Sequence, residues 1–127
     1  MKRQFFSALF LIVSVIVGLG AFGHSAQWFS HVNGALGGVA PDTVRLLEVI
    51  WLWVSGTMLS FGVLLLWCGW KLRRGDASLV VIPWVTGGFY ILAGTWAAIW
   101  TRPFFWLFPL LGLLLWLCAW MLQPKTA

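Results

Sequence analysis

Charged residues are scarce in this chain of 127 amino acids. Lys, Arg, Asp and Glu together make up 9% of the sequence, only three residues are acidic, and 61% are hydrophobic. An ordinary soluble domain carries about 25% charged residues. So few charges could not cover the surface of a water-soluble fold of this size, and the composition therefore predicts a protein surrounded largely by lipid.

The chain also lacks the common motifs of enzymes. It has no glycine-rich phosphate loop, nucleophile elbow or zinc-protease motif. Its net charge of +5 forms no basic stripe with interleaved aromatic residues, which a nucleic-acid-binding surface would show. We therefore expect a protein that is not an enzyme and does not bind nucleic acid, and we assign no catalytic residue, metal ligand or cofactor.

Cysteine is rare as well, since Cys68 and Cys118 are the two that occur. Both lie near the predicted inner ends of apolar segments, on the reducing side of a membrane, where disulfides are uncommon. We expect both residues to pack as small apolar side chains.

Long charge-free runs dominate what remains. A helix needs about 20 apolar residues to cross the 30 Å hydrocarbon core of a bilayer, and helices satisfy their backbone hydrogen bonds without water. The second predicted helix, from Thr43 to Leu72, would be about 45 Å long, so it must tilt or project from the bilayer. The sequence predicts an all-α fold in which residues 1–127 form a single transmembrane domain, a bundle of four helices with antiparallel up-down topology. Four spans are expected: residues 5–23, 49–70, 79–100 and 103–122.

Basic residues gather at one set of predicted helix ends. The positive-inside rule then places both termini in the cytoplasm. We expect a multi-pass protein of a bacterial inner (plasma) membrane, whose first span is retained rather than cleaved as a signal peptide. Six basic residues lie on the predicted inner side: Lys2, Arg3, Lys71, Arg73, Arg74 and Lys125. Two lie on the predicted outer side, Arg45 and Arg102.

Small residues recur at every seventh position of the predicted helices. A seven-residue period keeps one stripe toward a partner helix, and small side chains let helix backbones approach each other in lipid. We expect these stripes to face the bundle interior and Leu65 to face outward. The stripes are Ser7, Ser14 and Ala21; Glu48, Ser55, Gly62 and Gly69; Gly87 and Gly94; Gly112 and Ala119.

Tryptophan is frequent, with eleven residues. Its indole ring favours the lipid–water interface, so we expect two belts at the helix ends. The outer belt would contain Trp28, Trp51, Trp53, Trp96, Trp100 and Trp106, and the inner belt Trp67, Trp70, Trp84, Trp116 and Trp120.

Both histidines lie in the stretch GAFGHSAQWFSHVNGALGGVAPDTVRLLE. We expect His24 to close the first helix at the outer interface and to meet Glu48, with Arg45 competing for that carboxylate. His31 would lie in the following loop. On a straight helix the two histidines would stand about 10 Å apart, too far for one metal ion. The candidate ligand-binding residues are His24, Arg45, Glu48, Trp51 and Tyr90.

The layout GLGAFGHSAQWF, a short outer loop and RLLEVIWLWVSGTMLSFGVLLL resembles small uncharacterised four-helix integral membrane proteins of bacteria. In those proteins a histidine lies at the outer end of the first helix and a tryptophan near the start of the second, which His24 and Trp51 match. In size and topology the chain is also broadly similar to DoxX-like proteins. The resemblance covers most of the chain as layout and implies no activity.

Three functions agree with these features. The leading interpretation is a non-enzymatic accessory or interaction component of the membrane, whose partners are the lipid bilayer and either another membrane protein or further copies of the chain. The first alternative is a binder or transporter of a small lipophilic molecule that uses the outer polar cluster. The second alternative is a haem or metal redox subunit.

Overall fold

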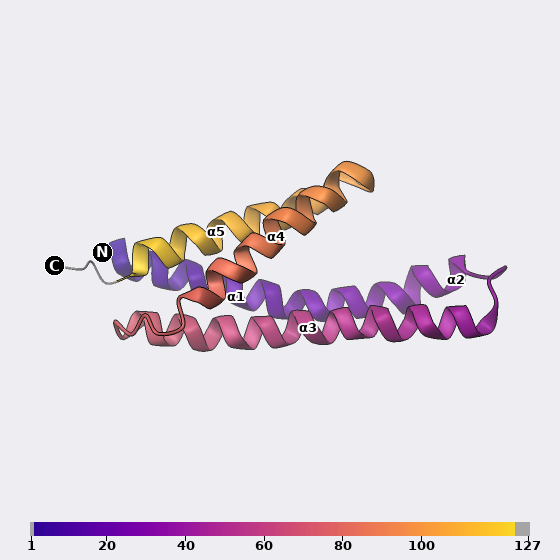
Figure 1. Cartoon of the computed structure of the whole chain (residues 1–127), viewed down its shortest axis with the longest axis horizontal. Coiled ribbons are helices and arrows are strands. Elements are labelled where there is room, and N and C mark those ends of the chain that lie inside the picture. Colours follow the sequence, from indigo (N-terminus) through magenta and orange to yellow (C-terminus); the bar gives the residue numbers. More distant parts are fainter. Residues whose placement is uncertain (1, 124–127) are drawn as a thin grey trace. The chain divides into compact units, whose positions relative to one another are not determined.

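The computed structural model describes residues 2–123, and almost all of them are helical. No strand occurs in this range, so the all-α prediction is confirmed for the described part of the chain. The elements are α1 (Lys2–Gln27), the π-helical turn η1 (Trp28–Val32), α2 (Asn33–Ala35), α3 (Pro41–Arg73), α4 (Val81–Trp100), the 3-10 turn η2 (Pro103–Trp106) and α5 (Leu107–Leu122) (Figure 1).

Within residues 2–123, four helical stretches are long and apolar enough to cross a membrane. They correspond to the four predicted spans, but the first runs twelve residues beyond its predicted end at residue 23. The sequence has no proline before Pro41, and a glycine costs a helix only about 1 kcal/mol, so the helix continues past Gly23. The expected outer loop is therefore reduced to residues 36–40. The four stretches are Lys2–Ala35, Pro41–Arg73, Val81–Trp100 and Pro103–Leu122.

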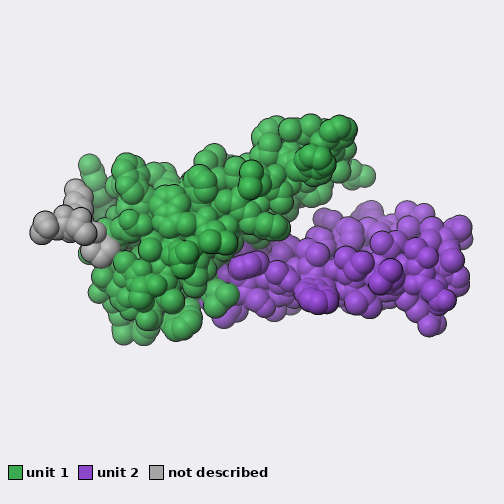
Figure 2. Space-filling model, in the orientation of Figure 1, with its two compact units in different colours: residues 1–14, 64–127 green, residues 15–63 purple. Residues whose placement is uncertain are grey.

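The chain divides into two compact units, coloured separately in Figure 2. Unit 1 consists of residues 1–14 and 64–127, and unit 2 consists of residues 15–63. Unit 1 thus holds all of α4 and α5, together with the beginning of α1 and the end of α3.

In unit 1, glycines bring α4 and α5 into close contact, and Figure 1 shows the two helices side by side. A Cβ atom placed on Gly112 would lie 2.5 Å from the carbonyl oxygen of Gly87, and Gly94 meets α5 just as closely. The Trp116 indole N–H donates to the Trp84 carbonyl at 2.8 Å. Because any side chain at these glycines would collide with the partner helix, the sequence permits this approach only through them.

The beginning of α1 and the end of α3 also pack together in unit 1. A Cβ atom on Gly69 would lie 2.7 Å from Cδ1 of Phe10, which is itself completely buried. Arg3 donates from Nη2 to the carbonyl of Leu72 at 3.2 Å. The carbonyls of the last helical turn have no partner within their own helix, so this arginine caps α3 from outside.

A short turn joins α3 to α4. Gly75 has a φ of +86°, a left-handed conformation that glycine adopts without steric penalty. Asp76 then accepts a hydrogen bond from the Ser78 amide at 2.9 Å and pairs with Lys71, with 2.9 Å between Nζ and Oδ2. These bonds hold the turn between the two helices.

In unit 2, α1 runs beside α3. A Cβ atom on Gly18 would lie 3.5 Å from the Cα atom of Gly62, and one on Gly20 would lie 3.0 Å from the terminal methyl group of Met58. Small residues on both helices thus allow backbone and side chain to approach closely.

The predicted stripes of small residues face the protein interior. Every small residue named in those stripes is buried, and Glu48 is half-buried. The outward placement of Leu65 is wrong, because this side chain is fully buried. Leu65 follows Gly62 by three residues and precedes Gly69 by four, so helical geometry puts all three on one face.

Candidate functional site

His24 and Trp51 form the centre of the candidate site, which lies in unit 2. Their rings stack with centroids 4.3 Å apart and an interplanar angle of 14°, and Trp51 Nε1 donates to the His24 carbonyl at 2.6 Å. The Oγ atom of Ser55 lies 2.9 Å from His24 Nδ1. Trp28, which is 1% exposed, packs on Trp51 with 5.9 Å between ring centroids. We call these four residues the His24 cluster.

Simple helical spacing produces this arrangement. His24 and Trp28 are four residues apart on one helical stretch, and Trp51 and Ser55 are four residues apart on α3. Residues four apart lie on the same helix face, one above the other. Each helix therefore presents one pair, and the close contact of α1 with α3 joins the pairs.

Ser55 engages one nitrogen of the His24 ring. Its hydroxyl oxygen lies 2.9 Å from His24 Nδ1 and 3.1 Å from the carbonyl oxygen of Trp51. A serine hydroxyl has a single hydrogen, so it either donates to the Trp51 carbonyl and accepts from Nδ1, or donates to Nδ1. In both arrangements Nδ1 is bonded to Ser55, and Nε2 is the ring nitrogen that has no bond within the cluster.

A π-helical turn follows the histidine. The Asn33 amide donates to the carbonyl of Trp28, five residues earlier, which is the wider π-helical pattern. The wider turn rotates the residues that follow, and His31, expected in a loop, is helical and exposed. His31 is hydrogen-bonded to its neighbour Ser30 with 2.5 Å between Nδ1 and Oγ, so it does not join the cluster.

The expected contact of His24 with Glu48 and Arg45 does not form. His24 instead bonds Ser55, which lies two helical turns beyond Glu48 on the same stripe of α3. The difference follows from the helix boundary: because the first helix continues past residue 23, His24 lies further along α3 than a helix end would. Arg45 is exposed, and within residues 2–123 neither it nor Glu48 forms an ion pair.

Tyr90 is not part of the His24 cluster. It lies on α4 in unit 1, where it is 5% exposed and its ring centroid is 5.8 Å from that of Phe108. Among the described residues its hydroxyl has no hydrogen-bond partner. The structure thus joins His24 and Trp51 of the candidate ligand-binding residues, and it leaves Arg45, Glu48 and Tyr90 elsewhere.

The tryptophans fall into two groups. Seven of them are exposed on helix surfaces, and the two interfacial belts stay a prediction for these. The other four form two packed pairs, Trp28 with Trp51 in unit 2 and Trp84 with Trp116 in unit 1. The belt interpretation missed Trp28 as a cluster residue, although its four-residue spacing from His24 could have revealed it. The exposed residues are Trp53, Trp67, Trp70, Trp96, Trp100, Trp106 and Trp120.

The chemistry available to the His24 cluster is limited. It offers one imidazole nitrogen, while the Ser55 hydroxyl and the Trp51 indole N–H bond within the cluster. In the part of the chain that the structure describes, no group of three or more His, Cys, Asp or Glu side chains could hold a metal ion. The cluster is therefore best suited to joining two helices.

No protein-family model, curated protein or solved structure matches this chain. The resemblance to small four-helix bacterial membrane proteins, which rests on His24 and Trp51, stays a prediction.

Proposed function

We propose that this protein spans the inner (plasma) membrane of a bacterium as an antiparallel up-down bundle of four helices, with both termini in the cytoplasm. Its apolar helix surfaces support this, for example Leu92 on α4, which is 75% exposed. Basic residues mark one side, with Lys2 and Arg3 opening α1 and residues 71–74 closing α3. Lys125, counted on the same side, lies outside the described residues.

Helix length is the observation that carries the proposed role. Lys2–Ala35 and Pro41–Arg73 contain 34 and 33 residues, or about 50 Å each at 1.5 Å per residue. The hydrocarbon core is about 30 Å thick. A tilt of about 40°, the upper end of the usual range, would leave about 8 Å of such a helix outside the core, and the average tilt of about 20° would leave about 17 Å.

The surplus length lies at the outer ends of these helices. The basic residues at the start of α1 and the end of α3 anchor those ends at the inner interface. About 20 residues per helix cross the core, so residues 24–52 lie beyond it, and we call this segment the outer overhang. It carries exposed apolar side chains where no acyl chain can cover them: Phe29, Val39, Leu46, Leu47, Val49 and Ile50.

An exposed apolar surface outside the hydrocarbon core is typical of a protein interaction site. The proposed function is therefore that of a non-enzymatic accessory component, which binds another membrane protein through the outer overhang. The alternative of a lipophile bound at the His24 cluster has less support, because the Ser55 hydroxyl, the Trp51 indole N–H and Nδ1 of His24 are already engaged there. A haem or metal redox role would rest on a single imidazole nitrogen.

Site-specific photo-crosslinking in native membranes tests this function. A photoreactive amino acid would replace Phe29 or Leu46 in the overhang, and Leu92 on α4 as the matched control. We expect one discrete protein adduct from the two overhang sites and lipid adducts alone from Leu92. Lipid adducts at all three sites would contradict an interaction role, and an adduct of twice the mass of the chain would identify a second copy as the partner.

The membrane orientation needs its own measurement. Reporter domains fused after Ala127 and inserted at Gly37 should report the cytoplasm and the outer side, respectively. A C-terminal reporter on the outer side would rule out either four spans or the proposed orientation.

A further inference from the structure

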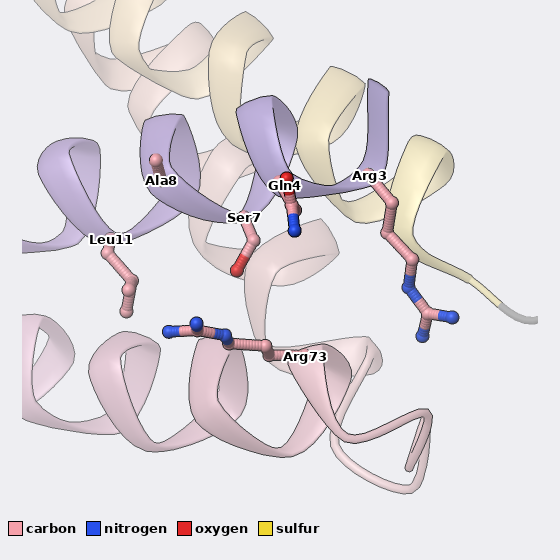
Figure 3. Close-up of a pocket in the computed structure, with 6 residues that line it drawn as sticks. All are labelled: Arg3, Gln4, Ser7, Ala8, Leu11 and Arg73. Atoms are coloured by element: carbon pink, nitrogen blue, oxygen red, sulfur yellow. The ribbon is translucent and has the colours of Figure 1, made fainter. Parts of the chain in front are cut away.

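A cleft of about 310 Å³ opens between the beginning of α1 and the end of α3 in unit 1 (Figure 3). Both helices contribute an arginine, and the apolar side chains of Ala8 and Leu11 continue the lining along α1. The lining residues are Arg3, Gln4, Ser7, Ala8, Leu11 and Arg73.

Ser7 is the unusual residue of this cleft. Its side chain is only 6% exposed, yet its hydroxyl has no hydrogen-bond partner among the described residues. Figure 3 shows this hydroxyl pointing from α1 toward the side chain of Arg73 on α3. Buried hydroxyls are nearly always hydrogen-bonded, so the position of Ser7 indicates a partner that occupies the cleft.

Other hydroxyls of the protein show what Ser7 could have done instead. Serine and threonine in a helix commonly bond to the carbonyl four residues earlier, and six residues here follow that pattern. Ser7 departs from it, as does Thr86 on α4, although the carbonyl of Arg3 occupies the corresponding position for Ser7. The six residues are Ser14, Ser30, Ser55, Thr57, Ser60 and Thr101.

Within residues 2–123, no carboxylate pairs with the arginines of this cleft. The sequence has three acidic residues, and in unit 1 the acid is Asp76, which is already paired with Lys71 at 2.9 Å. Within residues 2–123 this is the only ion pair. Arg73 carries a full charge into the cleft, and Arg3 retains N–H donors beyond the one that bonds the α3 terminus.

The donors around the cleft match a phosphate group. Guanidinium groups bind phosphate oxygens through paired hydrogen bonds, and the Ser7 hydroxyl and the Gln4 amide can donate to further oxygens. The Ala8 and Leu11 side chains offer an apolar path from this polar end along α1. A phosphate with an attached hydrocarbon chain fits both halves of the cleft.

We propose that this cleft binds the phosphate of an anionic phospholipid, whose first acyl carbons lie against Ala8 and Leu11. Basic pockets between transmembrane helices on the cytoplasmic side are suited to such headgroups. The proposal rests on the membrane-spanning part of the proposed function but not on the outer overhang. Soluble phosphate shares the same chemistry, and the experiment below separates the two sources.

The test is lipid titration of the purified full chain in mild detergent, with bound lipid counted by native mass spectrometry. The probes are phosphatidylglycerol, zwitterionic phosphatidylcholine and inorganic phosphate as competitor. Arg73→Gln is compared with Arg74→Gln, which removes the same charge from an arginine that stacks on Trp70, 3.8 Å from the ring centroid, and does not line the cleft.

We expect Arg73→Gln to weaken phosphatidylglycerol binding about tenfold or more, the scale of one lost charged hydrogen bond. Arg74→Gln should weaken it less than about threefold, the effect of one exposed surface charge. Ser7→Ala should cost about threefold, the scale of one neutral hydrogen bond, while Ser60→Ala, whose hydroxyl bonds its own helix, should cost nothing.

Three outcomes would overturn the proposal. Equal losses from Arg73→Gln and Arg74→Gln would mean non-specific charge attraction, and equal binding of both lipids would mean no headgroup recognition. Displacement of the lipid by inorganic phosphate would mean a site for soluble phosphate. If Arg73→Gln loses its helical circular dichroism, the Ser7→Ala and Ser60→Ala pair decides in the same way. Failure of any kind here leaves the overhang crosslinks unchanged, so the two proposals fail separately.

Discussion

Neighbouring glycines on α4 should respond differently to the same substitution. Replacing Gly by Ala inside a helix gains up to about 1 kcal/mol from backbone propensity at either position. At Gly88 the new Cβ would lie 3.4 Å from Cζ2 of Trp116, an ordinary contact. At Gly87 it would lie 2.5 Å from Cδ1 of the same indole and 2.8 Å from the Gly112 carbonyl oxygen.

The Gly87 contact cannot be relieved by a small side-chain movement. The carbonyl of Gly112 is backbone, and Trp116 is held by its hydrogen bond to the Trp84 carbonyl. Such overpacking costs about 1–3 kcal/mol. We therefore expect Gly88→Ala to stabilise the protein by up to about 1 kcal/mol. The Gly87→Ala variant should be about 1–3 kcal/mol less stable than the Gly88→Ala variant.

Thermal unfolding of both variants in the same detergent, followed by helical circular dichroism, measures this difference. A gap of about 1–3 kcal/mol corresponds to roughly 4–12 °C in the midpoint for a chain of this size. Because both variants make the same chemical change in adjacent positions of one helix, propensity cancels and the gap reports packing alone. Equal midpoints would refute the close approach of α4 to α5.

Two further predictions concern the helix connections. Trp51→Phe removes the donor to the His24 carbonyl and should lower the stability of the protein by about 1–2 kcal/mol. Trp53→Phe, at a side chain that is 74% exposed, should change the stability by less than about 0.5 kcal/mol. The thermal unfolding midpoints of the two variants measure this difference. Hydrogen bonds from Ser78, with the nearby lysine, lower the pKa of Asp76 from 3.8 to about 2. Asp76 therefore stabilises the folded protein fully above the pKa of 3.8 that it has in the unfolded chain, and this contribution is lost as the pH falls to about 2. Asp76→Asn should remove this part of the pH dependence of the thermal unfolding midpoint.

The sequence predicted the helices well because lipid-exposed segments need long apolar runs, which are visible without any tertiary information. The seven-residue stripes also predicted the buried faces, since close helix contacts require small residues such as Gly87 and Gly112. The end of the first helix was wrong. Charge and hydropathy indicate where a helix could leave lipid, but they do not indicate where the helix ends, and after Gly23 no proline stops it before Pro41.

The candidate site depended on that boundary and was predicted only in part. His24 and Trp51 were both named, but their partner Ser55 was known only as a member of a small-residue stripe. The register of two antiparallel helices depends on where the turn between them lies, and the structure has a short turn at residues 36–40 where the sequence predicted a long loop after Gly23. With the first helix extended to residue 35, Ser55 rather than Glu48 lies opposite His24.

The His24 cluster would hold α1 and α3 together at the base of the proposed outer overhang. Within lipid, the bilayer confines two helices and small residues such as Gly18 and Gly62 let them meet. Beyond the hydrocarbon core that confinement ends, and an isolated pair of helices in water is only marginally stable. The cluster lies where the overhang begins and joins α1 to α3 through directional hydrogen bonds of 2.6 and 2.9 Å. Those bonds fix the register of the two helices and, in the proposed function, the side on which Phe29 and Leu46 would face a partner.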